Sequence, residues 1–387
     1  MSKHASLICY VGNGVVKAAV VINEKNKVPT IVTTRLRELP YHEFIDRDHL
    51  ESRIMSEYIS LIKDIKLKDL TSAACAGIKL SDACVILSSP WYVSETKIVK
   101  IHHDKPFVIT EKILDDAIAA TAGDYMQKQK QGISILERNV IRYLLNGYPT
   151  ASPLKKTAQH VEISVFLSFC RSKTVDKIKQ TILSHLGVHE TNIHSQSLAA
   201  FTAIKETWKD IPNYVLTDIS SQLTELMIVR ENSLAEAASF PLGKQFVISE
   251  LGKRLNTNGE VSSSLLRLYK DNTIDQSLKT KVDEAIVSIR QEWLRPFTKA
   301  LGEMSAGSSL PSRFILFSPK DTEWLFAGFI KSEEYQQFTF SEGKFEVYEA
   351  KVEDFEHSYN IAENVPRDIS LAVGTIFLHK KIEGIIY

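Results

Sequence analysis

Two short apolar stretches, far apart in the chain, constrain the fold of this 387-residue protein more than any other feature. The first runs from Leu7 to Val21 and the second from Tyr214 to Val229. Each is an apolar run interrupted by a polar or glycine-containing turn, which is typical of a β-hairpin. A hairpin at the start of each half of the chain predicts two related domains separated by a cleft. The two turns would then face each other across a bound nucleotide.

The first turn contains groups that can hold a phosphate. Gly12 and Gly14, with Asn13 between them, allow backbone amides to approach an anion, and Lys17 can add a positive charge. Glycine is also an ordinary residue of hairpin turns, so this turn alone does not identify a ligand. Tyr10 occupies the position where an acid matching that of the second turn is expected.

The second turn contains a candidate metal-binding acid. Asp218 ends a strand and could hold a hydrated cation, and the hydroxyls of Ser220, Ser221 and Thr224 follow it. The turn has no glycine, so its backbone is expected to wrap less tightly around a phosphate. Glu225 is expected to be a solvated strand residue, and no residue is evident as a catalytic base. These turns are therefore better suited to cradle a phosphate than to hydrolyse one.

The composition excludes several classes of protein. The chain has 47 basic and 47 acidic residues, so its balance does not favour nucleic acid or an anionic membrane as a partner. No apolar run is long enough to span a bilayer, and the N-terminus lacks a secretion signal, so we expect a cytoplasmic protein. The cysteines are scattered singly and are expected to be buried reduced thiols: Cys9, Cys75, Cys84 and Cys170.

Apolar periodicity predicts further elements, including an inserted region between the two hairpins. Helical spacing is seen over 48–65, 173–186 and 279–304, and 371–379 is predicted to be a closing helix. Within the insertion we expect strands over 92–101 and 161–170, a helix capped by Thr110, and a turn at Asn146 and Gly147. Adjacent His102 and His103 point to opposite faces of an extended segment, so they are not expected to share a metal ion.

The order of these elements resembles the actin-like ATPase superfamily, in particular its bacterial branch containing FtsA and PilM. Residues 10–17, YVGNGVVK, are similar to the first phosphate loop, and 218–225, DISSQLTE, to the second, without its glycines. Residues 240–243, FPLG, resemble the strand end before a helix of the second domain. Residues 195–204 and 366–375 resemble the two connecting helices, and 315–320, ILFSPK, stand at the adenosine loop.

The resemblance implies an α/β fold: two actin-like, ribonuclease H-like domains with an inserted small α+β subdomain. The expected first domain comprises 1–83 and 172–211 with the last helix, 366–387. The inserted subdomain comprises 84–171, and the second domain, with its small helical subdomain, 212–365. The resemblance also implies a nucleotide site that includes Gly243 and Ser318 besides the two turns. Because glycines are lost there, we expect ATP and Mg²⁺ to bind weakly or not at all, with Asp218 holding the metal through water.

The resemblance further implies a scaffold at the inner face of the cell membrane, assembling a pilus or cell-division apparatus. Its partner would be the cytoplasmic tail of a membrane protein, accepted near the inserted subdomain, or another copy of the chain. The alternative is an active actin-fold ATPase or a sugar or acetate kinase, which Tyr10 and the sequence Ser318-Pro319-Lys320 disfavour. A chaperone of the same superfamily would need a further substrate-binding domain, which we do not expect in this protein.

Overall fold

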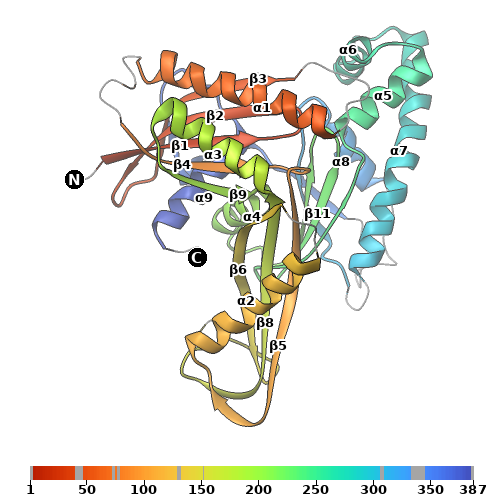
Figure 1. Cartoon of the computed structure of the whole chain (residues 1–387). Coiled ribbons are helices and arrows are strands. Elements are labelled where there is room, and N and C mark those ends of the chain that lie inside the picture. The colour runs from red at the N-terminus through yellow and green to blue at the C-terminus, as the bar shows by residue number, and fades with distance from the viewer. Residues whose placement is uncertain are drawn as a thin grey trace.

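A computed structural model describes residues 3–39, 47–71, 75, 79–128, 132–150, 152–305, 309–332 and 345–384. Within these residues the strands form three sheets (Figure 1). A six-stranded sheet has the order β15-β3-β2-β1-β4-β9, a five-stranded sheet β12-β11-β10-β13-β14, and a four-stranded sheet β5-β8-β6-β7. The mixed α/β class expected from the sequence is confirmed.

The six-stranded sheet contains the first predicted hairpin. Its strands are β1 (Lys3–Val11), β2 (Val15–Glu24), β3 (Thr30–Glu38), β4 (Leu80–Leu87), β9 (Glu190–Ser195) and β15 (Asn360–Ile361). Helices α1 (Arg47–Asp64) and α3 (Ser172–Leu186) pack on one face, and α1 continues into a π-helical turn, η1 (Ile65–Asp69). The apolar side of α1, with Ile54 and Tyr58, meets Leu7 and Val20 of the sheet in one buried core.

The five-stranded sheet contains the second predicted hairpin. Its strands are β10 (Tyr214–Ile219), β11 (Thr224–Arg230), β12 (Ser233–Phe240), β13 (Arg313–Phe317) and β14 (Glu346–Glu349). One face is covered by α5 (Lys244–Leu255), α7 (Gln276–Met304) and α8 (Glu323–Lys331), with α6 (Gly259–Lys270) against α5. The long apolar stripe of α7 forms the centre of this core, where Trp293 and Phe297 are fully buried.

Two helices join the two larger sheets. Helices α4 (Gln196–Thr207) and α9 (Ile369–Ile382) share one core with both sheets, together with the 3-10 helix η4 (Val352–Ser358). Ile8 and Ile86 of the first sheet and Leu216 and Met227 of the second belong to this core. Besides its own core, each half is therefore packed on a common helical layer.

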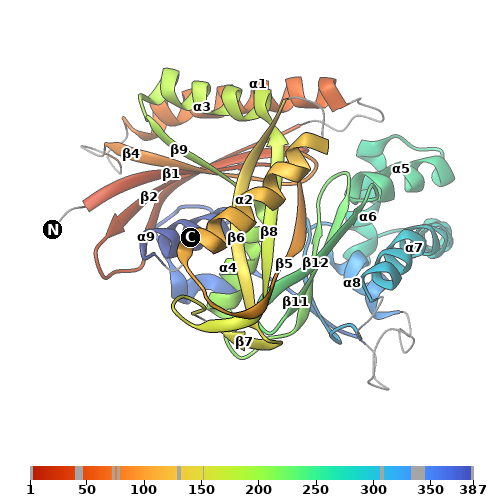
Figure 2. The ribbon, with the colours of Figure 1, turned by 60° about the horizontal axis from the view of Figure 1, so that its bottom comes forward.

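The four-stranded sheet projects from the rest of the molecule (Figures 1 and 2). It consists of β5 (Tyr92–Val108), β6 (Ile133–Leu145), β7 (Tyr148–Thr150) and β8 (Thr157–Arg171), and α2 (Glu111–Lys128) packs on it. Asn146 and Gly147 form the expected turn, both at positive φ. This separate sheet begins at Tyr92, because β4 lies wholly in the first sheet. Likewise β15, which we had expected within the second domain, pairs with β3 of the first.

Candidate functional site

The two hairpin turns meet each other directly. Asn13 is 3% exposed, and its Nδ2 donates to Ser220 Oγ over 3.2 Å. The backbone N–H of Ser221 donates to Asn13 Oδ1, also over 3.2 Å. A Cβ at Gly14 would lie 3.1 Å from Ser221 Oγ. The structure thus brings four of the residues predicted from the sequence together, and one amide side chain bridges the two turns.

Gly243 permits the second turn to pack on the start of α5. A Cβ at this position would lie 2.4 Å from the carbonyl oxygen of Ser220, which is closer than real Cβ atoms approach. The amides of Lys244 and Gln245 donate to the carbonyls of Ser220 and Ser221, over 3.1 and 2.7 Å. Helix N-terminal amides commonly bind phosphates. Here the turn itself satisfies these two amides.

Gly12 is fixed in the first turn by hydrogen bonds on both of its backbone groups. Its N–H donates to Val15 over 2.8 Å, and its carbonyl accepts from Trp91 Nε1, also over 2.8 Å. A Cβ at Gly12 would lie 3.0 Å from the ring of Tyr10, which is buried. Burial and the nearby charge of Asp218 raise the pKa of the Tyr10 hydroxyl. The residue replacing the expected acid is therefore a neutral part of the core.

Lys17 is turned toward the last helix. Its Nζ lies 2.7 Å from Asp368 and 3.1 Å from Ser370 Oγ, and it also lies over the ring of Tyr10. Asp368 caps α9 by accepting from the amides of Ser370 and Leu371. The ammonium group predicted to bind phosphate therefore already has a carboxylate partner, which the local sequence around Lys17 did not indicate.

Asp218 and Glu225 form a pair of carboxyls beneath the turns. They are directly opposite each other on β10 and β11. Burial and the neighbouring charge of Glu225 raise the pKa of Asp218 to about 7, against the opposing effect of Lys17. A carboxyl that retains its proton near neutral pH is a weaker cation ligand than an ionised one. The role of Asp218 in holding a hydrated metal stays a prediction.

Glu225 is not a solvated strand residue, and that expectation is wrong. Its side chain is 5% exposed and accepts hydrogen bonds from Tyr92 over 2.8 Å and from Ser89 and Ser197 over 2.9 Å. Burial raises the pKa of Glu225, while these hydroxyls oppose the effect. Its partners come from the β4–β5 connection, from β5 and from α4. This residue of the second domain therefore binds three segments that lie far from it in the sequence.

The remaining two predicted residues do not join the turns. Thr224 Oγ1 donates to the carbonyl of Leu242 over 2.8 Å and is fully buried. Ser318 Oγ is buried and has no hydrogen-bond partner in the described part of the chain. Beyond it, Asp321 pairs with Lys244 of α5 over 2.5 Å.

Neither a metal cluster nor a cavity marks these turns in the described part of the chain. In the described ranges no three His, Cys, Asp or Glu residues are grouped to hold an ion. His102 stacks on His160, and His103 packs against Phe107, so the two neighbours point apart as expected. Two cavities of about 340 and 420 Å³ lie elsewhere, and none of the predicted site residues lines them.

Comparison with solved structures shows which fold this is. The chain is similar to a structure described as the PilM-PilN type IV pilus biogenesis complex, with a TM-score of 0.64 and 12% identity. The match covers 96% of this chain and 98% of that one. The chain has the actin-like fold. The ethanolamine utilization protein EutJ from Carboxydothermus hydrogenoformans also matches, at a TM-score of 0.44 and 10% identity over 98% of this chain and 90% of that one.

Sequence comparison adds nothing to this result. A scan for known protein families matched none, and a search of curated proteins found no match. The actin-like fold thus rests on the arrangement of the elements. The order of the elements, including the inserted sheet, indicated this fold, although both turns lack residues typical of the superfamily's phosphate loops. Among the described residues, no helix is long and apolar enough to cross a membrane.

Proposed function

We propose that this chain is a cytoplasmic actin-fold scaffold of a membrane-associated assembly, of the pilus or cell-division type, which hydrolyses little or no ATP. The observation that carries the proposal is the Asn13 bridge between the two turns. A triphosphate in an actin-like cleft needs both turns to offer free amides and hydroxyls to its oxygens. In this chain the turns bond to each other and to α5.

Buried polar contacts also support a role as a rigid body. Glu225 links the second domain to β5 and α4, and a second buried carboxylate, Glu137 of β6, links the projecting sheet to the first domain. Glu137 accepts from the backbone and hydroxyl of Ser195, over 2.8 and 2.7 Å, and lies 3.2 Å from His194 Nδ1. Buried hydrogen-bond networks whose polar groups are paired favour a single relative arrangement of the domains they connect.

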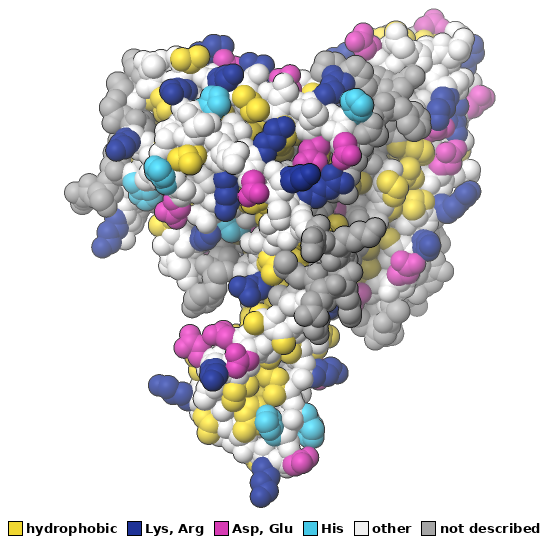
Figure 3. Space-filling view, viewed as in Figure 1, with side chains coloured by type: hydrophobic (Ala, Val, Ile, Leu, Met, Phe, Trp, Pro, Cys, Tyr) yellow, Lys and Arg dark blue, Asp and Glu magenta, His cyan; other side chains and the backbone are white. Residues whose placement is uncertain are grey.

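The projecting sheet offers a surface for a protein partner. Strand β5 is at its edge, and Ile98 in this strand is 60% exposed. Figure 3 shows hydrophobic side chains gathered on the projecting part. An exposed edge strand can accept an extended peptide through its backbone groups, with side chains adding specificity. We propose that the cytoplasmic tail of a membrane protein, or a second copy of the chain, binds here.

Measurements with nucleotide test the proposal that this chain hydrolyses little or no ATP. A protein that binds MgATP gains about 2.7 kcal/mol of stability at a hundredfold excess of ligand over Kd, which raises its melting temperature. We expect no rise for this chain with millimolar MgATP and no release of phosphate. The Asn13→Ala variant, which removes the bridge, should respond more than the native chain. Steady release of phosphate by the native chain would instead favour the ATPase or kinase alternative.

Site-specific crosslinking tests the proposal that a protein partner binds at the edge strand β5. A photoreactive residue at Ile98 of the full chain should crosslink in cells to the cytoplasmic tail of a membrane protein or to another copy of the chain. The same residue at Val287 of α7, which is also exposed, is the matched control. Equal recovery of the same partner from both positions would argue against the β5 edge as the binding surface.

A further inference from the structure

The outer helical layer of the first domain ends in a surface that the proposed function does not use. Helices α1 and α3 lie side by side over the six-stranded sheet, facing away from the second domain (Figures 1 and 2). The π-helical turn η1 ends α1, and Gly187 at positive φ ends α3. π-Helical segments are rare and often occur at functional sites.

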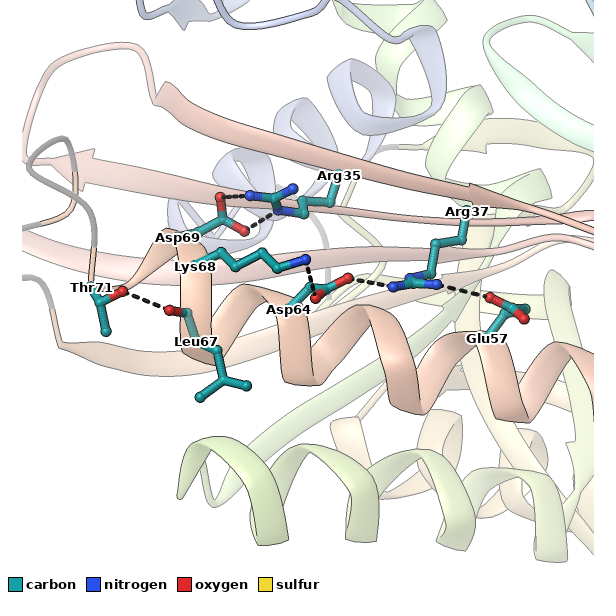
Figure 4. A network of polar contacts seen from close by, with 8 residues as sticks. All are labelled: Arg35, Arg37, Glu57, Asp64, Leu67, Lys68, Asp69 and Thr71. Carbon is teal, nitrogen blue, oxygen red and sulfur yellow. Dashed lines mark hydrogen bonds and ion pairs between the residues drawn. The ribbon is translucent and has the colours of Figure 1, made fainter.

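The acidic residues around η1 are neutralised from the side of the sheet (Figure 4). Asp69 accepts from Arg35 Nε over 2.6 Å and from Nη2 over 3.0 Å. Asp64 pairs with Arg37 over 2.5 Å and with Lys68 over 2.7 Å. Arg35 and Arg37 both come from β3. The carboxylates of this region are therefore engaged with cations of the same domain.

The outward side of the same region is left basic and apolar. Lys63 and Lys66 are exposed, and neither has an ion-pair partner among the described residues. Leu67, at the centre of η1, is 67% exposed. From α3, exposed Lys179 and the 43% exposed Leu183 lie on the neighbouring ridge. We call these five residues the Leu67 patch.

A groove lies between the η1 residues and the α3 residues of the Leu67 patch. The cavity of about 420 Å³ lies between η1 and the end of α3, and Lys66 and Leu183 both line it. Helix α3 carries one acid, Asp176, and three lysines at 173, 177 and 179. The local charge is thus positive, although the chain as a whole has no net charge.

We propose that the Leu67 patch rests against an anionic phospholipid surface. Exposed leucines can enter the boundary between headgroups and acyl chains, while flanking lysines meet the lipid phosphates. The patch lies on the outermost layer of the domain, where a flat bilayer can reach it without clashing with the projecting sheet. This inference goes beyond the proposed scaffold role, because it concerns direct contact with lipid and needs no protein partner.

Vesicle binding by the full chain tests this inference. We expect sedimentation with vesicles containing phosphatidylglycerol, but not with phosphatidylcholine alone, and loss of binding at high salt. Each lysine near an anionic surface strengthens binding by about fivefold, so the loss of two should weaken binding by about 25-fold. The K66E/K179E double variant also reverses both charges and should bind at least that much more weakly. Leu67→Gln should also weaken binding, without any change of charge.

The control is K281E/K299E, which makes the same change of charge on exposed lysines of α7. Circular dichroism melting would establish that all variants are folded. Equal binding by the two double variants, or no binding of the native chain to anionic vesicles, would overturn the proposal. So would binding to soluble polyglutamate through Lys66 and Lys179 without binding to vesicles, because the partner would then be an acidic protein.

Discussion

Asp218 and Glu225 face each other across the β10–β11 hairpin at the boundary between the domains. The pKa of Asp218 is raised to about 7 by burial and by Glu225, and burial raises the pKa of Glu225 also. Neighbouring carboxyls in a shared buried site titrate as a pair. The pair therefore makes the stability of the domain arrangement depend on pH.

Asp218→Asn should remove part of that dependence. Because the folded pKa lies above the ordinary value of 3.8, the folded state holds the proton more tightly than the unfolded state. The resulting stability is complete below about pH 4 and is lost as the pH rises through about 7. The native chain should therefore lose stability relative to the variant over this range, by about 1.4 kcal/mol for each unit of pKa difference. Urea unfolding at several pH values measures this, and a constant difference would contradict it.

Glu225→Ala should destabilise the chain by about 2 kcal/mol or more, because Ser89 and one of the mutually bonded hydroxyls of Tyr92 and Ser197 lose their carboxylate acceptor. Glu236→Ala, on the exposed side of the neighbouring strand β12, is the control and should change the free energy of unfolding by less than about 0.5 kcal/mol. Chemical denaturation at one pH compares the two. Similar effects would mean that the hydroxyl contacts contribute little.

Gly243→Ala should lower the free energy of unfolding by about 1–3 kcal/mol, because the added Cβ meets backbone atoms of the second turn. Gly328 provides a contrast inside helix α8, where a Cβ would meet nothing within 4 Å. Gly328→Ala should raise stability by about 0.5–1 kcal/mol through the better helix propensity of alanine. Thermal melting of both variants should shift in opposite directions, and a shift of the same sign would be inconsistent with the close packing at Gly243.

Lys17 and Asp368 should be energetically coupled, since their charged atoms are 2.7 Å apart and both side chains are mostly buried. A double-mutant cycle with Lys17→Met and Asp368→Asn isolates the pair, because asparagine can still cap α9. We expect a coupling free energy of about 0.5–3 kcal/mol. If the two substitutions were simply additive, the ammonium group would be free to serve another ligand.

Much of the secondary structure could be predicted because it is encoded locally. The alternating apolar residues of Leu7–Val21 and Tyr214–Val229 define strands with two buried faces, and the stripe through Trp293 and Phe297 defines α7. Turn residues such as Asn146 and Gly187 also acted as expected, because they adopt positive φ readily. These features depend on neighbours a few positions away.

The hydrogen-bond and ion-pair partners of the site residues could not be predicted from local sequence patterns. Asn13 meets Ser220 and Lys17 meets Asp368 only after both domains have packed on α4 and α9. Glu225 looks like a surface residue in its own strand, but α4 and β5 cover it.

The sequence by itself determined the two hairpins and the order of the elements, because periodicity and turn chemistry act over short distances. The resemblance of that order to the actin-like superfamily then implied the architecture. Only the tertiary structure decided that the two turns bond to each other and that the lysine of the first turn pairs with the last helix. Hydrogen bonds and ion pairs of this kind depend on the relative orientation of whole domains, which no local pattern specifies.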